Sequence, residues 1–285
     1  MEEEKMLSAH PVSDAMRQRV LHHIARIEDV EDARVLFACE SGSRGWGFAS
    51  PDSDYDVRFI YVRRLDSYLT LEPVRDVIER PIDDELDIGG WYLRKALQLL
   101  RDSNPTLMEW LRSPIVYSQE DEFATRLMAL AVSGFSPVRG YHHYVSMAKK
   151  NLREHLSGDV VRYKKYLYVL RPLLAARWIR EGRGIPPMRF AELAQSTLDD
   201  TALIAEINAL LAVKMRASES ATSPRWLGLH AFIERELAQA QAHPMTQATK
   251  AEGAALDRLL SDTVRRLDAA AATTERTEGR IHDRN

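Results

Sequence analysis

Residues 40–59 read Glu-Ser-Gly-Ser-Arg-Gly-Trp-Gly-Phe-Ala-Ser-Pro-Asp-Ser-Asp-Tyr-Asp-Val-Arg-Phe, and this stretch decides which fold is expected. It follows an apolar run at residues 33–39, which predicts a mostly buried strand. Residues 41–53 are rich in glycine and serine and predict a loop or a short helix. Residues 55–62 predict a second strand, because β-branched and aromatic side chains predominate there.

Two carboxylates of this stretch are expected to share one face of the second strand. Side chains alternate across a strand, so Asp54 and Asp56 project together while an apolar set takes the opposite face. Like charges at this spacing repel each other, and a divalent cation between them removes the penalty. Oxygen ligands of this kind favour Mg²⁺ or Mn²⁺. A solvated turn is the alternative; it explains Asp52, but not Asp56, after which the strand continues.

The glycine and serine that follow the first strand are candidate phosphate ligands. Gly42 permits close approach of the backbone to a ligand, and Ser43 adds a hydroxyl donor beside exposed N–H groups. The alternative role of Ser43 is to cap a short helix. Arg44 is a candidate nucleotide ligand, and both Arg44 and Arg58 either reach phosphates or balance the nearby carboxylates.

A third carboxylate is expected from a neighbouring strand, where Leu86-Asp87-Ile88 places an acid between two apolar residues. Asp87 is the candidate ligand for a second metal and the candidate base for an attacking hydroxyl. Glu85 shares its face by alternation and is the reserve candidate. Gly89-Gly90 is expected to close this short strand.

The rest of the chain divides into an α+β part and an all-helical part. A short strand is expected at 74–79. Helical periodicity predicts helices at 16–27, 91–101, 105–111, 121–133, 138–156, 160–181, 189–196, 200–216, 224–241 and 253–270. The predicted organisation is a catalytic domain at 1–115, a helical domain at 116–270 and a disordered tail at 271–285.

Composition excludes several protein classes. The 285 residues carry 39 Lys and Arg against 42 Asp and Glu, a net charge of −3. The one cysteine, Cys39, rules out a disulfide framework and a cysteine-rich zinc module. No apolar run approaches the ~20 residues of a membrane span, and the polar first ten residues are unlike a secretory signal. A cytoplasmic protein without membrane partners is expected.

Positive charge gathers in one segment of the predicted helical domain. Residues 139–183 contain eleven basic residues and three acidic ones, so this segment carries +8 and the remainder −11. Basic groups of this kind suit a polyanion, RNA included, although long helices also carry Lys and Arg simply as a solvated face. Lys164, Tyr168 and Arg171 share a helical face and are candidate nucleotide ligands; a solvent-exposed face is the alternative.

The motifs together resemble a known superfamily. Gly42-Ser43, Asp54-x-Asp56 and Asp87 resemble the signature of the polymerase-β-type nucleotidyltransferases. Residues 40–62, Leu86 to Trp91, Ser103-Asn104-Pro105 and Lys164 to Pro172 resemble, more closely, the bacterial and phage group linked to RNA repair. The resemblance runs from about residue 33 to 270. It implies a small mixed sheet flanked by helices, then a helical domain, and transfer of a nucleoside monophosphate from an NTP.

The functional hypothesis is therefore a metal-dependent nucleotidyltransferase. Asp54 and Asp56 would bind Mg²⁺ (or Mn²⁺), Asp87 would assist a second metal and the acceptor hydroxyl, and Gly42 and Ser43 would hold phosphates. An RNA end is the preferred acceptor, and a protein or small molecule is the alternative. A non-catalytic nucleotide- or RNA-binding module is disfavoured, because such a module has no need of three convergent carboxylates.

Overall fold

The computed structural model describes residues 11–80, 85–216, 222–246 and 253–282, and its centre is a five-stranded mixed sheet. The strand order is β3(Val77–Glu79), β4(Leu86–Tyr92), β2(Tyr55–Arg63), β1(Ala33–Glu40) and β5(Val116–Gln119). β2 and β4 run parallel, and the other pairs run antiparallel. The predicted α+β class with a small mixed sheet is confirmed.

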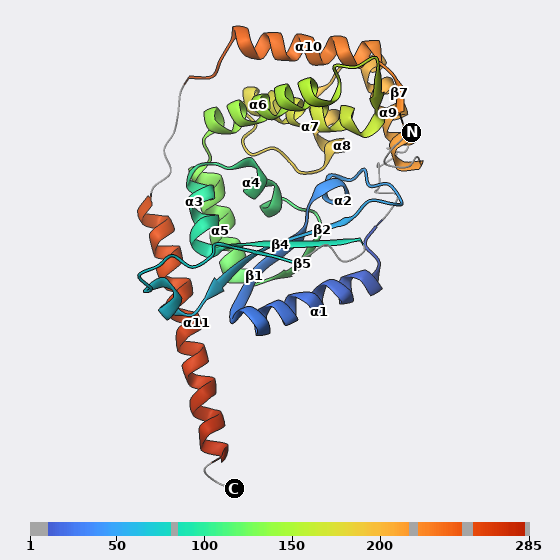
Figure 1. Cartoon of the computed structure of the whole chain (residues 1–285). Helices are drawn as coiled ribbons and strands as arrows, with labels where there is room; N and C mark the ends of the chain where they lie inside the picture. Colours follow the sequence, from blue (N-terminus) through green and yellow to red (C-terminus); the bar gives the residue numbers. More distant parts are fainter. Residues whose placement is uncertain (1–10, 81–84, 217–221, 247–252, 283–285) are drawn as a thin grey trace, which may run out of the picture.

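Helices cover both faces of this sheet (Figure 1). On one face, α1(Asp14–Glu31) buries an apolar stripe, Met16, Val20, Ile24 and Ile27, in the same core as Val57, Phe59 and Tyr61 of β2. On the other face lie α3(Leu93–Arg101), α4(Pro105–Leu111) and α5(Asp121–Gly134), which share a second core with Ile60 and Val62. The polar residues at the start of β2 belong to this second face, just before its apolar part begins.

The predicted end of β4 at Gly89-Gly90 is wrong, because the strand continues through both glycines to Tyr92. In the parallel pair, Gly90 lies opposite Phe59. A Cβ atom on Gly90 would stand 2.2 Å from the Phe59 ring. The glycine therefore leaves room for an aromatic side chain within the strand, and the helix that follows begins at Leu93 instead of Trp91.

The second half of the chain is a helical layer stacked above the sheet layer (Figure 1). It comprises α6(Pro137–His155), α7(Tyr163–Arg180), α8(Phe190–Thr197), α9(Thr201–Arg216) and α10(Leu227–Ala242). α7 is its buried centre and continues through Pro172. A two-stranded sheet of β6(Val160–Arg162) and β7(Thr222–Pro224) interrupts the expected all-helical pattern, since three-residue strands are too short for periodicity to reveal.

The described elements cross the predicted domain boundary at residue 115. β5 pairs with β1 in the main sheet, and α11(Gly253–His282) returns to pack on α3 and α5. One apolar core joins the two halves. α11 also extends to His282 where a disordered tail was expected, because alanine, glutamate and arginine favour helix even without an apolar stripe. None of the described helices has the length and apolarity that a membrane span requires.

Candidate active site

The parallel pairing of β2 with β4 places two of the predicted carboxylates side by side. Asp56 lies directly opposite Asp87 in the strand register, and their side chains are 29% and 33% exposed. Asp54 immediately precedes β2 and is exposed. Burial raises the pKa of the Asp56 carboxyl group, and the nearby charges of Asp87 and Asp54 act on it in the same direction. The structure therefore gathers the three acids that the sequence analysis singled out.

Arg58 contacts both members of this carboxylate pair. Its Nη2 atom donates to Oδ2 of Asp87 at 2.6 Å and to Oδ1 of Asp56 at 3.2 Å. Among the described residues, no group of three or more His, Cys, Asp and Glu side chains is arranged to hold a metal ion. Of the two roles expected for Arg58, the structure supports the balancing of carboxylates.

Burial is the largest influence on Asp56. It raises the pKa of this carboxyl group, and the charges of Asp87 and Asp54 raise it further. The guanidinium groups of Arg58 and Arg44 act in the opposite direction and lower it. A positive charge at this position therefore favours the ionised form of Asp56, which is the form that ligates a cation.

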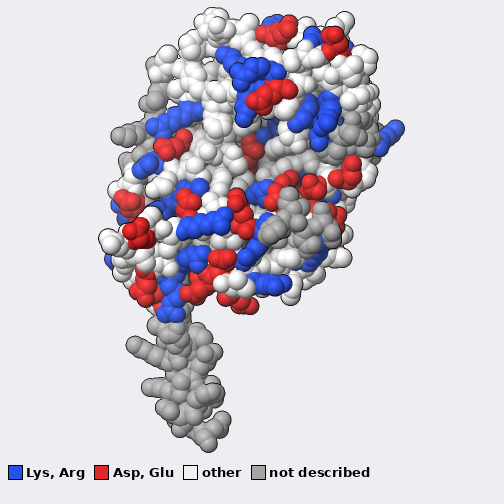
Figure 2. Space-filling view, viewed as in Figure 1, with Lys and Arg blue, Asp and Glu red and all other residues white. Residues whose placement is uncertain are grey.

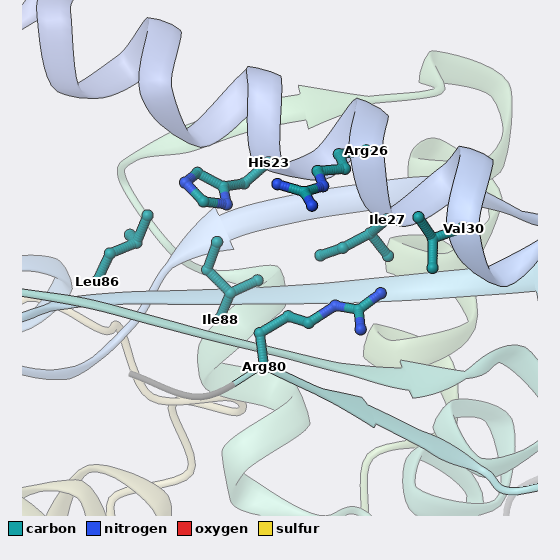
Figure 3. A pocket seen from close by; sticks show the side chains of 7 residues that line it. All are labelled: His23, Arg26, Ile27, Val30, Arg80, Leu86 and Ile88. Carbon is teal, nitrogen blue, oxygen red and sulfur yellow. The ribbon is translucent and has the colours of Figure 1, made fainter. Parts of the chain in front are cut away.

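Figure 3 shows the face of β4 opposite to the one that carries Asp87. Leu86 and Ile88 face α1 across a pocket that also contains His23 and Arg26. Because side chains alternate, Asp87 between them lies on the face away from α1. The reserve candidate Glu85 precedes β4 and is paired instead with Arg19 of α1 at 3.6 Å. Its carboxylate is therefore separate from the Asp56–Asp87 pair.

Glu40 is a buried carboxylate that the sequence analysis assigned no role. It ends β1, is 0% exposed, and accepts a hydrogen bond from the backbone N–H of Asp56 at 2.9 Å. Its other oxygen accepts from the hydroxyl of Tyr117 in β5. Glu40 therefore fixes the backbone from which the Asp56 carboxylate projects. Its signal in the sequence is an acid that directly continues the apolar run at 33–39.

The loop after β1 forms a short helix, α2(Gly42–Trp46), beside the carboxylates. Gly42 has a φ of +56°, and a Cβ atom there would lie 1.9 Å from Oδ2 of Asp56. The glycine is thus required by the backbone conformation and by the close approach of a catalytic candidate. The N-cap of α2 is Ser41, so Ser43 lies within the helix and the capping alternative is wrong.

Arg44 is 4% exposed and points into the loop that leads to β2. It donates to the carbonyl oxygens of Ser53 at 2.7 Å and Asp54 at 3.3 Å. Its guanidinium also lies 3.7 Å from the centre of the Tyr55 ring. In this arrangement Arg44 holds the backbone around Asp54, which differs from the predicted direct contact with a nucleotide.

Arg171 is buried in the helical layer and not presented to solvent as a free cation. It is 3% exposed, donates to Oε1 of Glu109 in α4 at 2.8 Å, and lies 4.5 Å from the ring of Trp46. Glu109 also accepts from the hydroxyl of Tyr144 at 3.1 Å. Arg171 was predicted to contact a nucleotide, but it lies in the core because α7 is buried around most of its circumference. The face that was predicted to be polar is therefore interior at this turn.

Tyr168 and Lys164 occupy the partly exposed end of the same helix. The ring of Tyr168 packs edge-on against Trp46 of α2, with 5.6 Å between the centroids. Trp46 also packs against Phe48, with 5.6 Å between the ring centroids. This end of α7 therefore borders the Gly-Ser helix, while Arg171 one turn further lies in the core.

The pKa of Glu40 predicts how stability depends on pH. Burial raises this pKa from 4.5 to about 7, although hydrogen bonds from Tyr117 and Asp56 oppose the rise. The folded protein therefore holds a proton that the unfolded chain releases, and stability falls as pH rises from 4.5 to about 7. Glu40→Gln mimics the protonated form, so its free energy of unfolding should exceed that of the parent by up to about 3 kcal/mol above pH 7.

Urea unfolding of both proteins at pH 5 and pH 8 measures this difference. Glu79→Gln, at a side chain that is 67% exposed, is the control and should follow the parent at both pH values. An advantage of Glu40→Gln that is equal at pH 5 and pH 8 would contradict the assignment of the titrating group.

Sequence comparisons with known proteins agree with the motifs. A sequence model of the RNA repair pathway DNA polymerase beta family matches residues 16–262. The chain is 44% identical over 251 residues to YcgL of Bacillus subtilis (strain 168), described as an uncharacterized protein; the alignment covers 87% of this chain and 96% of YcgL. A solved nucleotidyltransferase-like protein from Exiguobacterium sibiricum 255-15 is 14% identical, with 87% of this chain and 75% of that chain covered and a TM-score of 0.30.

Proposed function

The chain belongs to the RNA repair pathway DNA polymerase beta family, and from this premise we propose that it transfers a nucleoside monophosphate from an NTP to an acceptor hydroxyl. The observation that carries the proposal is the juxtaposition of Asp56 and Asp87 on parallel strands, with Asp54 beside them. Two carboxylates on adjacent strands and a third just before β2, next to a Gly-Ser helix, suit a substrate that brings phosphates and a cation.

The donor chemistry of these residues suits a hard divalent cation. Asp54, Asp56 and Asp87 supply carboxylate oxygens, the donor type that Mg²⁺ and Mn²⁺ prefer. When bound, such a cation neutralises charge on the phosphates during transfer. Asp54 and Asp56 would hold it together with the triphosphate, and Asp87 would hold a second one. Glu40 keeps the backbone of Asp56 in place for this role.

The protein's own groups account for the remaining steps. Asp87 would accept the proton of the acceptor hydroxyl as its oxygen bonds to the α-phosphorus, and the bond to the bridging oxygen of pyrophosphate breaks with its electron pair on the leaving group. Gly42 and Ser43 would contact the β- and γ-phosphates. Tyr168 and Lys164 would contact the nucleotide. Arg44 and Arg171 are buried and would instead hold the loop before β2 and the contact between α7 and α4 in place.

An RNA end is the proposed acceptor. Basic residues that already pair with acids of the protein are less suited to bind RNA phosphates, which reduces the number of candidate contacts. At least five of the eleven basic residues in the segment at 139–183 pair with acids of the described part of the chain: Arg139, Arg171, Arg177, Arg180 and Arg183. Figure 2 shows Lys and Arg interleaved with Asp and Glu over the face that it presents. Four exposed basic residues lie together in sequence around the α6–β6 connection: Lys149, Lys150, Arg153 and Arg162. We call this set the α6 basic end.

The test of the function is a labelling reaction. The protein is incubated with each α-labelled NTP and with Mg²⁺ or Mn²⁺. The acceptors are RNA oligonucleotides that carry either a free or a phosphorylated 3′ end, and pools of protein and of small molecules. Label in RNA with a free 3′ hydroxyl supports the proposal. Label in protein or in a small molecule identifies the alternative acceptors, and no transfer from any NTP to any acceptor contradicts the function.

Charge reversal at the α6 basic end tests RNA binding separately. Lys149→Glu with Lys150→Glu should weaken RNA binding roughly tenfold or more at low salt and reduce the salt slope by about two, because two phosphate contacts are lost. The Michaelis constant for NTP should be unchanged. Binding is measured by fluorescence anisotropy across a salt series.

The matched control reverses two exposed arginines on α11, Arg258→Glu with Arg265→Glu, which makes the same change in net charge. Equal losses of affinity in both double variants would indicate a general charge effect. A flat salt response in the parent would favour a protein or small-molecule acceptor.

A further inference from the structure

We propose that Arg58 is a built-in counter-ion of the Asp56–Asp87 pair, which stabilises the protein when no divalent cation is bound and competes with that cation for the two carboxylates. The inference rests on the proposed function for the nature of the site. It adds a property of this chain: the affinity of the site for metal is set by a neighbouring arginine.

The position of the guanidinium carries the first step. One nitrogen, Nη2 of Arg58, reaches Asp87 at 2.6 Å and Asp56 at 3.2 Å, so it lies between two carboxylates that face each other in register. Two like charges in adjacent strands destabilise a sheet unless a cation offsets them. Arg58 supplies that cation, and it acts on the same oxygen atoms that a metal ion would need.

The anchoring of Arg58 carries the second step. Its other terminal nitrogen, Nη1, donates to the carbonyl oxygens of Val57 and Asp87, each at 3.0 Å. The side chain is 22% exposed, so most of it is buried within the protein. Because these anchors are backbone atoms, they do not depend on where the carboxylates point. Arg58 is therefore a fixed charge of the site rather than a mobile surface arginine.

Competition follows from these two steps. An incoming divalent cation meets a fixed positive charge close by, and it must take carboxylate oxygens that already accept hydrogen bonds from that charge. Arg44, whose charge also acts on Asp56, donates to carbonyl oxygens of the loop before β2. Removing the charge of Arg58 should therefore lower the stability of the metal-free protein and raise its affinity for the metal ion.

Binding of Mn²⁺ in the absence of NTP tests the inference, followed by the electron paramagnetic resonance signal of free Mn²⁺. Arg58→Gln should bind Mn²⁺ roughly tenfold more tightly than the parent does. A factor of this size corresponds to a modest Coulomb repulsion between the partly exposed Arg58 guanidinium and the metal ion. Its unfolding temperature should fall in EDTA and recover more than that of the parent at saturating Mn²⁺. Arg75→Gln removes an equal charge from a side chain that is 72% exposed and is the control.

Arg58→Lys covers the case in which Arg58→Gln does not fold. Lysine keeps the charge but cannot bond both to the backbone and to the carboxylates through two nitrogens. Its Mn²⁺ affinity should lie between those of the parent and Arg58→Gln, and if Arg58→Gln is unfolded, an affinity above the parent's supports the proposal.

The results that overturn the inference are distinct from those that overturn the function. Parent protein that binds Mn²⁺, with unchanged or weaker binding in the folded Arg58 variants, refutes the competition alone. Absence of Mn²⁺ binding in parent and variants refutes both the competition and the proposed metal site. Nucleotidyl transfer is not needed for either reading.

Discussion

Asp56→Asn is expected to lower nucleotidyl transfer by roughly 10³-fold while the protein remains folded. Asp56 is the candidate ligand with the most neighbours in the site: it pairs with Arg58, faces Asp87, and has its backbone N–H held by Glu40. Asparagine keeps the size and one acceptor oxygen but removes the charge that a divalent cation requires. The initial rate with a labelled NTP measures the loss.

The control is Asp52→Asn, which makes the same chemical change in the exposed turn of the same loop and should leave the rate within about twofold of the parent. Relief of the repulsion between neighbouring carboxylates, taken by itself, predicts that the stability of the metal-free protein holds or rises. Because Arg58 already offsets that repulsion, we expect little change in the unfolding temperature of Asp56→Asn. Transfer that persists at the parent rate would remove Asp56 from the site.

Arg171→Met is expected to destabilise the protein by about 3–5 kcal/mol, because it leaves the carboxylate of Glu109 buried without its ionic partner. The guanidinium is 3% exposed and connects α7 with α4. Adding Glu109→Gln should restore most of the loss, since the neutral amide still accepts from Tyr144. Urea unfolding of the single and double variants measures both effects.

This prediction also separates two roles of Arg171. A packing role predicts a large change in unfolding free energy with little change in the Michaelis constant for NTP among the molecules that remain folded. The nucleotide contact suggested by the helical face predicts the reverse, a raised Michaelis constant in a protein of parental stability. A loss below about 1 kcal/mol would contradict the packing role.

Short-range pattern predicted the elements that build the site. The apolar run at 33–39, the alternation after Asp54 and the Leu86-Asp87-Ile88 sequence each concern neighbours in the chain, where strand geometry determines which side chains share a face. The family could also be identified from these motifs, and the match over residues 16–262 confirms it. The same reasoning placed the helices of the second half, with boundaries that moved by a few residues.

Partners distant in the sequence depended on how the elements pack. No local pattern shows that Glu40 bonds to Asp56 and Tyr117, or that Arg58 lies between two carboxylates 31 residues apart in the chain. Gly89-Gly90 reads as a stop because glycine weakens a strand, and only the ring of Phe59 across the parallel pair explains why the strand continues there.

The sequence by itself therefore determined the fold class, the family and the three acids of the candidate site, since all three follow from residue type and spacing. The tertiary structure alone decided which charges are already paired. Arg171 and Arg44 look like free cations in the sequence, but burial commits them to Glu109 and to backbone carbonyls. A charge moved out of water requires a partner, and which partner is available depends on elements far apart in the chain.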